Sequence, residues 1–265
     1  MLKNLKIEWM KIKNYRVFQV FSALYLMGLL LVVYIFYKVY LNVVGSVQQT
    51  VTGTQGKGSD VLNLFSSEFL MQTVCFWTGF LLYLPGMIII SLFINEVNFK
   101  TNRQNIIDGW KRETYIFSKI GLIACMAVVI AIVNLIAGFI ISEVVGVSMS
   151  ADALKMVGFS FVQAMVYLLF ALLLATFFRR SGVAIIVFFI YGLLLEFLFM
   201  WIAGKISPGL QHFMPLQVAD SLTPFPRLRD FYIGLPSETV MLFAAMAFGG
   251  LYAFLTVRKY KYDDL

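Results

Sequence analysis

Six long apolar runs alternate with polar segments along this chain. Each run covers about 20 residues, the length that an α-helix needs to cross roughly 30 Å of hydrocarbon. Lipid offers the backbone no hydrogen-bond partners and the runs lack the alternation of barrel strands, so we expect helices. The predicted spans are 17–37, 74–94, 120–141, 157–178, 182–202 and 239–257.

The composition supports an all-α membrane protein with a single transmembrane domain, 1–265. Apolar residues make up 60% of the chain and charged residues 13%, whereas a soluble domain carries about a quarter charged residues. We find no soluble domain and no internal repeat. The net charge of +7 is explained by topology and by anionic lipid, without any nucleic-acid partner.

The positions of lysine and arginine predict the topology. The segments 1–16, 95–119, 179–181 and 258–265 share one side of the membrane and hold 5, 5, 2 and 3 of these residues, 15 of the 21 in the chain. The positive-inside rule therefore places both termini in the cytoplasm, and we expect the membrane to be a bacterial inner membrane. The first span lacks an A-x-A-like cleavage site and is interpreted as a retained anchor.

Two connecting regions have patterns of their own. Residues 1–16 place Leu2, Leu5, Trp9 and Ile12 on one helical face, which predicts a helix lying on the cytoplasmic leaflet; a topogenic charge cluster is the alternative. The outer segment between spans 5 and 6 holds five of the six prolines among apolar residues. It predicts short helices that re-enter the outer leaflet.

Three further features carry no chemistry of their own. The stretch GTQGKGS (residues 53–59) lacks the G-x-x-x-x-G-K-[ST] spacing of a phosphate-binding loop. His212 is the only histidine, so we expect it at the surface or the membrane interface, and we expect no metal site. Cys75 and Cys125 fall near opposite membrane faces, too far apart for a disulfide.

The polar segment 100–119 predicts a short cytoplasmic helix. Thr101 and Gln104 have the spacing of a capping box, which starts the helix at Asn102. Gly109 ends it, because glycine adopts positive φ without a steric penalty. A helix over 102–108 is too short to be stable alone and needs a partner surface, either its own bundle or another protein.

This segment resembles the first cytoplasmic loop of type-2 ABC transporter permeases. The matching residues are Asn95-Glu96, Lys100-Thr101-Asn102-Arg103-Gln104, Asp108-Gly109-Trp110-Lys111-Arg112 and Lys119. A second match is Tyr191-Gly192-Leu193-Leu194-Leu195-Glu196, followed by Phe213-Met214-Pro215-Leu216 and Leu222-Thr223-Pro224. The resemblance covers essentially the whole chain; Lys111 departs from it, because serine is common there.

The resemblance implies an exporter subunit whose coupling helix docks on an ATP-binding subunit. It implies two copies of that subunit, which carry ATP and magnesium, and a second permease, the same chain or a related one, all among membrane lipids. This chain would bind no cofactor and have no catalytic residue. The implied ATPase-coupling residues are Glu96, Thr101, Asn102, Arg103, Asn105, Ile106, Ile107, Gly109 and Arg112.

Three polar side chains inside the spans are candidates for translocation or gating. Glu196 lies about two-thirds of the way out along span 5, and a charge inside the bilayer marks either a function or a buried partner. We consider a hydrogen bond to the re-entrant segment and a substrate contact. Asn134 and Gln163 favour hydrogen bonds between helices over substrate binding.

Two other classes of function remain as alternatives. An ion-coupled secondary transporter or channel normally shows several intramembrane charges or broken helices in corresponding halves. An intramembrane enzyme needs H-E-x-x-H, a carboxylate pair or a serine–histidine arrangement, and the residue inventory offers none. Neither class fits the sequence as well as a permease does.

Overall fold

The computed structural model describes residues 2–49, 65–107, 109–226 and 234–262, and every regular element in these residues is helical. Within these residues, six helical segments are long and apolar enough to cross a membrane, which confirms the six predicted spans. The segments are Arg16–Asn42, Leu70–Asn98, Arg112–Val145, Asp152–Phe178, Ser181–Ile206 and Glu238–Tyr262. Each contains its predicted span and extends beyond it at one end or at both.

Several spans are interrupted or joined by short helices. The elements in chain order are α1 (Leu2–Lys13), α2 (Arg16–Gln49), α4 (Leu70–Gly79), η1 (Phe80–Leu82), α5 (Tyr83–Asn98), α6 (Thr101–Ile107), α7 (Arg112–Val145), α8 (Asp152–Phe178), α9 (Ser181–Ile190), η2 (Tyr191–Leu195), α10 (Glu196–Ile206), η3 (Leu210–Phe213), α11 (Gln217–Asp220) and α12 (Glu238–Tyr262). The predicted loop 53–59 lies outside the described residues.

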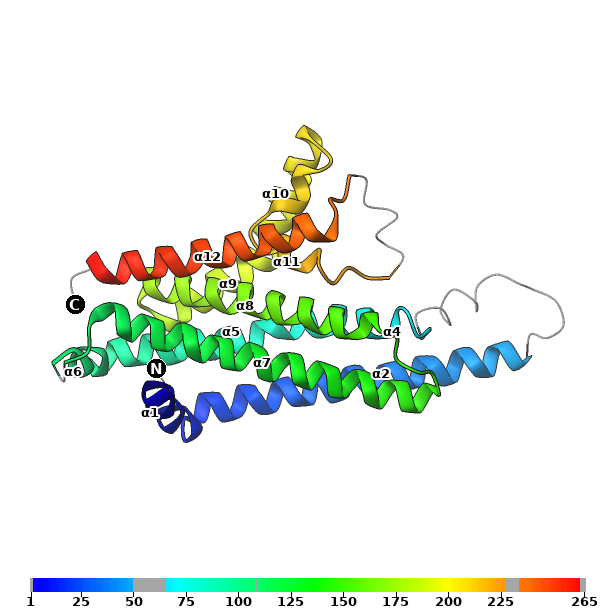
Figure 1. The fold of residues 1–265 in the computed structure, drawn as a ribbon, viewed down its shortest axis with the longest axis horizontal. Coiled ribbons are helices and arrows are strands. Elements are labelled where there is room, and N and C mark those ends of the chain that lie inside the picture. The colour runs from blue at the N-terminus through cyan, green and yellow to red at the C-terminus, as the bar shows by residue number, and fades with distance from the viewer. Residues whose placement is uncertain (1, 50–64, 108, 227–233, 263–265) are drawn as a thin grey trace.

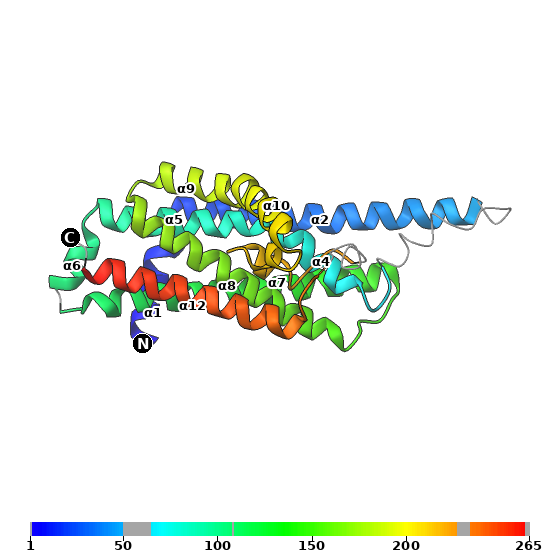
Figure 2. The ribbon, with the colours of Figure 1, turned by 90° about the horizontal axis from the view of Figure 1, so that it is seen from above.

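Helix α8 forms the centre of the bundle. It packs against α12, α5, α7, α4 and α9, as Figures 1 and 2 show. Its sequence is apolar on all sides, which is the pattern of a helix enclosed by others. By contrast, most of α2 faces outward, and only 17% of its most apolar window is buried.

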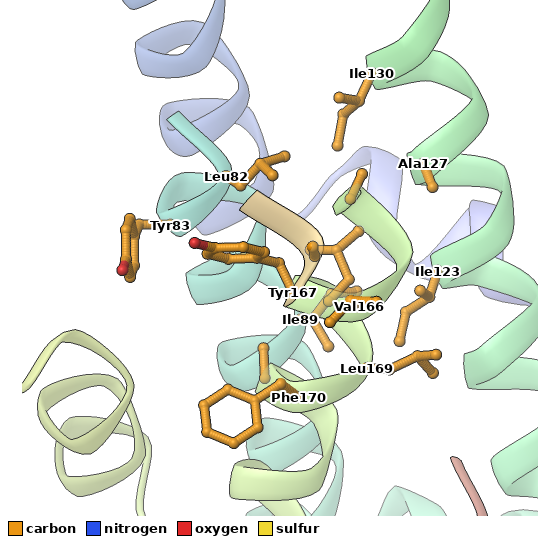
Figure 3. Close-up of a cluster of buried hydrophobic side chains, with 14 of the residues drawn as sticks. Leu82, Tyr83, Ile89, Ile123, Ala127, Ile130, Val166, Tyr167, Leu169 and Phe170 are labelled. Atoms are coloured by element: carbon orange, nitrogen blue, oxygen red, sulfur yellow. The ribbon is translucent and has the colours of Figure 1, made fainter. Parts of the chain in front are cut away.

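Figure 3 shows the core around α8. Val166 and Leu169 project from α8 toward Ile123 on α7. Tyr167 lies beside Tyr83 on the other side, and Phe170 packs on Phe188 of α9 and Tyr252 of α12. Aromatic rings extend this packing toward span 5, because Tyr83 stacks on Phe189 with ring centroids 5.0 Å apart. The core therefore fixes spans 2, 3, 4 and 5 relative to one another.

Span 5 changes direction in its middle. Helix α9 lies along the bundle, residues Tyr191–Leu195 form a π-helical turn, and α10 then points away from the long axis of the bundle (Figure 1). A π turn inserts one residue into an α-helix, and such turns often bend it. The bend brings Glu196, the first residue of α10, toward the segment that follows span 5.

One end of the bundle collects three features. Helix α6, the end of α12 and the start of α1 lie together there (Figure 1). The predicted apolar stripe of α1 is only partly inward, since Ile12 is 2% exposed and Trp9 is 54% exposed. The structure instead buries Glu8, at 0%, and this residue forms part of the site described next.

Candidate functional site

Helix α6 projects from the end of spans 2 and 3. It spans seven residues, and its outward side carries Arg103 and Ile107, the latter 78% exposed. Ile106 and Asn105 are half-buried. A seven-residue helix owes its stability to its surroundings, so the contacts at its two ends determine how it is presented.

The predicted capping box is wrong. The helix starts at Thr101, one residue earlier than predicted, and the Thr101 hydroxyl donates to the carbonyl oxygen of Glu96 at 3.1 Å. Lys100 has a φ of 57°, and its carbonyl accepts from the backbone N–H of Arg103 and Gln104. This left-handed residue directs Thr101 back toward span 2 instead of toward the first turn of α6.

Gly109 ends the helix as predicted. Its φ is 97°, and its N–H donates to the carbonyl of Ile106 at 3.0 Å. The next N–H, of Trp110, donates to the carbonyl of Asn105, also at 3.0 Å. These bonds satisfy carbonyls that the end of a helix leaves unpaired.

Gly109→Ala is expected to destabilise the protein by about 1 kcal/mol, because alanine is strained at positive φ. No atom lies within 4 Å of the added Cβ, so backbone strain alone is tested. Gly158→Ala in α8 is the matched control, since its added Cβ also meets open space and its φ is helical. Thermal unfolding in mild detergent should show loss of stability for the first variant only; equal behaviour would contradict the assignment.

A buried ion cluster lies beneath α6. We define it as Glu8, Glu96, Tyr115 and Lys119. The Lys119 ammonium lies 2.5 Å from Glu8 Oε2 and 2.6 Å from Glu96 Oε1, and the Tyr115 hydroxyl donates to Glu96 Oε2 at 2.7 Å. The lysine and Glu8 side chains are 5% and 0% exposed. Charges taken out of water are stable only when paired and hydrogen-bonded.

The ion cluster joins three elements that are distant in the sequence. Glu8 belongs to α1, Glu96 to α5, and Lys119 and Tyr115 to α7. Both helices that flank α6 are therefore fixed to each other and to α1 by charge. Helix α6 is therefore attached to spans that this cluster links to each other and to α1.

Helix α12 supports the other side of α6. Asn102 is 3% exposed, and its amide donates to the Tyr260 hydroxyl at 3.3 Å. Asn102 thus faces its own bundle, unlike the exposed Arg103 and Ile107. Tyr260 stacks on Tyr115 with centroids 5.2 Å apart, and Arg112 donates to the carbonyl of Lys261 at 3.2 Å.

Comparisons with models of known protein families, with curated proteins and with solved structures found no match. Arguments about its function therefore rest on the sequence and the structure of this chain.

Glu196 accepts hydrogen bonds from the segment after span 5. Its Oε1 lies 2.5 Å from the backbone nitrogen of Leu216 and 2.6 Å from that of Gln217. The side chain is buried, with the residue 4% exposed. The sequence left two interpretations of Glu196 open, a hydrogen bond to the re-entrant segment and a substrate contact. The observed geometry is that of a hydrogen-bonded link between span 5 and α11.

Asn134 and Gln163 both make hydrogen bonds between elements. Asn134 Nδ2 donates to Ser160 Oγ at 2.6 Å, from α7 to α8. Gln163 Nε2 donates to Asp220 Oδ1 at 2.9 Å, and its carbonyl accepts from Thr223. Asn134 therefore joins two spans, whereas Gln163 joins span 4 to the segment containing α11.

Gln163 also lines a pocket in the half of the bundle remote from α6. The pocket has a volume of about 270 Å³ and lies between α11 and the middle of spans 2, 4 and 5. We call it the Asp220 pocket. Burial raises the pKa of the Asp220 carboxyl to about 6, against the opposing effect of hydrogen bonds from Gln163 and Tyr167.

His212 does not lie at the protein surface, which was one of the two positions expected for it. The residue is 1% exposed, within η3, and it lines the Asp220 pocket. Proline-rich connections usually lie at the surface, but this one is packed into the bundle through Leu216, Val218 and Leu222. Among the described residues, no group of three or more histidine, cysteine, aspartate or glutamate side chains is arranged to hold a metal ion.

The sequence reasoning missed Glu8, Tyr115, Tyr260 and Asp220 as site residues. Glu8 carried a signal, since it is the one acidic residue among five basic ones in residues 1–16. Asp220 carried a similar one, as an acidic residue in an apolar, proline-rich stretch. Nothing local distinguishes Tyr115 and Tyr260 from the other tyrosines.

Proposed function

We propose that this chain is the membrane permease subunit of an ATP-driven ABC exporter. The observation that carries the proposal is the presentation of α6: a short helix with an exposed isoleucine, joined at both ends to spans that a buried ion cluster connects. Because Ile107 is exposed and the spans on both sides of α6 are fixed to each other, α6 is suited to receive force from a partner.

In this proposal α6 is the coupling helix and its end of the bundle is cytoplasmic, together with both termini. Helix α1 lies on the inner leaflet, and α11 belongs to a re-entrant segment in the outer leaflet. Two ATP-binding subunits, which carry ATP and magnesium, dock on two permeases. The second permease, identical or related, covers the apolar faces that spans 1 and 5 leave exposed, each only 17% buried.

The force would travel through named contacts. Closure of the ATPases moves α6, and the movement enters span 2 through Thr101 and Glu96. Thr101 holds the backbone carbonyl of Glu96 and Lys119 pairs with its carboxylate, so span 3 moves with span 2. Because Lys119 also holds Glu8, α1 moves as part of the same unit.

Ile107→Asp is expected to abolish recovery of the ATP-binding subunit when the tagged chain is purified from its native membrane in mild detergent. The side chain is 78% exposed, so the change leaves the fold intact while it places a charge in an apolar contact. Ile106→Asp combined with Ile107→Asp should act at least as strongly. Recovery is measured by mass spectrometry of the purified complex.

Leu154→Asp is the matched control, because Leu154 is 71% exposed near the start of α8, away from α6. It should leave recovery unchanged. If several mild detergents yield no ATPase with the unaltered chain, or if Ile107→Asp retains it fully, the proposal fails.

One observation favours a second candidate, an ion-coupled transporter. Glu196 and Asp220 place two carboxylates on either end of the short stretch that contains α11, and intramembrane carboxylates often relay ions. Transport that survives collapse of ion gradients while ATP is maintained supports the ABC proposal. Transport lost with the gradients supports the alternative.

A further inference from the structure

The Asp220 pocket combines one carboxylate with an aromatic lining. Asp220, Gln163, Ser221, Thr223 and Gln217 supply its polar groups. Its remaining lining is mainly aromatic or apolar: Phe76, Phe80, Tyr83, Tyr167, Leu193, Pro224, Phe225 and Leu235, with Gly79, Gly192 and His212 completing it. Pockets of mostly apolar lining with a few placed polar groups are typical ligand sites.

The carboxylate of Asp220 has only neutral donors among the residues that the structure describes. Tyr167 OH lies 3.0 Å from Oδ1 and 2.9 Å from Oδ2, and Gln163 Nε2 lies 2.9 Å from Oδ1. No described lysine or arginine lines the pocket. An ionised carboxylate accepts about four hydrogen bonds, so acceptor capacity remains on the pocket side.

Among the described residues, a second acidic group lies near the pocket. Glu196, whose carboxylate is held by the backbone of Leu216 and Gln217, adds a second acidic group behind α11. The only basic side chain of the described lining is His212, whose Nε2 lies 3.2 Å from the Gln211 amide nitrogen. A buried carboxylate without a cation is unfavourable, and a bound cation relieves that penalty.

The aromatic rings that line the pocket favour an organic cation over a metal ion. Phe76 packs edge-to-face on Phe80 and Phe225, with centroids 5.4 Å and 5.2 Å away, and Tyr83 does so on Tyr167 at 5.7 Å. Ring faces attract alkylammonium groups. A small hydrated metal ion prefers a shell of oxygen ligands instead.

From this geometry we propose that the Asp220 pocket binds the ammonium group of an organic cation, with Asp220 as its counter-ion and Phe76, Tyr83 and Phe225 as its aromatic walls. Cation binding at this site does not depend on whether ATP or an ion gradient drives transport. It can therefore be tested separately from the ABC proposal. The same chemistry is present in a soluble amine and in a choline lipid headgroup.

The test compares choline with 3,3-dimethyl-1-butanol, which has the same shape without the charge. Binding to the purified full chain in phosphatidylglycerol nanodiscs is followed by saturation transfer to the probe's methyl protons. Choline is expected to bind at least about tenfold more tightly than the alcohol, and Asp220→Asn should remove this difference. Equal affinities for the two probes, or no effect of Asp220→Asn, would overturn the proposal.

Two further variants keep the outcome interpretable. Glu68→Gln removes an exposed acidic side chain just before α4, outside the pocket, and should leave choline binding unchanged. If Glu68→Gln weakens choline binding as much as Asp220→Asn does, the binding depends only on surface charge and the proposal is overturned. If Asp220→Asn does not fold, Phe76→Leu must reduce the affinity for choline more than that for the alcohol, and an equal reduction overturns the proposal.

Adding phosphatidylcholine to the nanodiscs distinguishes the two sources. Competition with free choline supports the proposal with a lipid headgroup as the ligand. Unchanged binding of free choline supports it with a soluble cation.

Discussion

Lys119→Met is expected to lower the free energy of unfolding by about 3–5 kcal/mol, since removal of one partner leaves uncompensated charge in a buried site. The variant leaves Glu8 and Glu96 facing each other without the ammonium that lies within 2.6 Å of both. Unfolding in mixed micelles, followed by circular dichroism as sodium dodecyl sulfate is added, measures the loss.

The control for this prediction is Lys261→Met. Lys261 pairs with Glu113 at 2.7 Å, but both side chains are nearly half exposed, at 49% and 44%. Exposed pairs contribute little to stability, so this variant should behave almost like the unaltered chain. A triple variant, Glu8→Gln, Glu96→Gln and Lys119→Met, should regain much of the loss, because no buried charge remains. Equal stability of the two single variants would contradict the burial argument.

Glu196→Ala is expected to destabilise the protein by about 2 kcal/mol or more. It deprives two backbone N–H groups, of Leu216 and Gln217, of their acceptor, and each buried unpaired group costs about 1–3 kcal/mol. The same micellar unfolding measures the effect. Glu143→Ala, at an exposed position near the end of α7, should change stability little; a similar loss in both variants would contradict the role of Glu196 as a link.

Glu196→Gln separates structure from transport. The glutamine carbonyl still accepts from both N–H groups, so assembly should persist, while the loss of charge should alter transport kinetics. Unchanged kinetics would assign Glu196 a structural role alone.

The spans were predictable because a single physical condition, the thickness of hydrocarbon, acts on each of them locally. The end of α6 at Gly109 was predictable for a similar reason, since positive φ is a local property that glycine permits. The start of α6 was not, because the Thr101 hydroxyl could either accept from the backbone N–H of Gln104 or donate to a carbonyl oxygen outside the helix. Lys100, at positive φ, turned the chain so that the hydroxyl donates to the backbone carbonyl of Glu96.

The candidate site could be predicted only in part, because its decisive contacts are not local. Glu8 and Lys119 are 111 positions apart, and no periodicity in either segment encodes their meeting. Likewise Asp220 meets Tyr167 across 53 positions. Such pairs follow from how whole helices pack, which the sequence of one segment does not contain.

The π turn at Tyr191–Leu195 also sets the register of all that follows it in span 5. One residue of an α-helix corresponds to about 100° of rotation. Deleting one residue from this turn would restore regular α-helix and rotate the carboxylate of Glu196 by roughly that angle, away from Leu216 and Gln217. The extra residue of the turn therefore sets the direction in which the Glu196 side chain points. The hydrogen bonds that hold Leu216 and Gln217 depend on that direction.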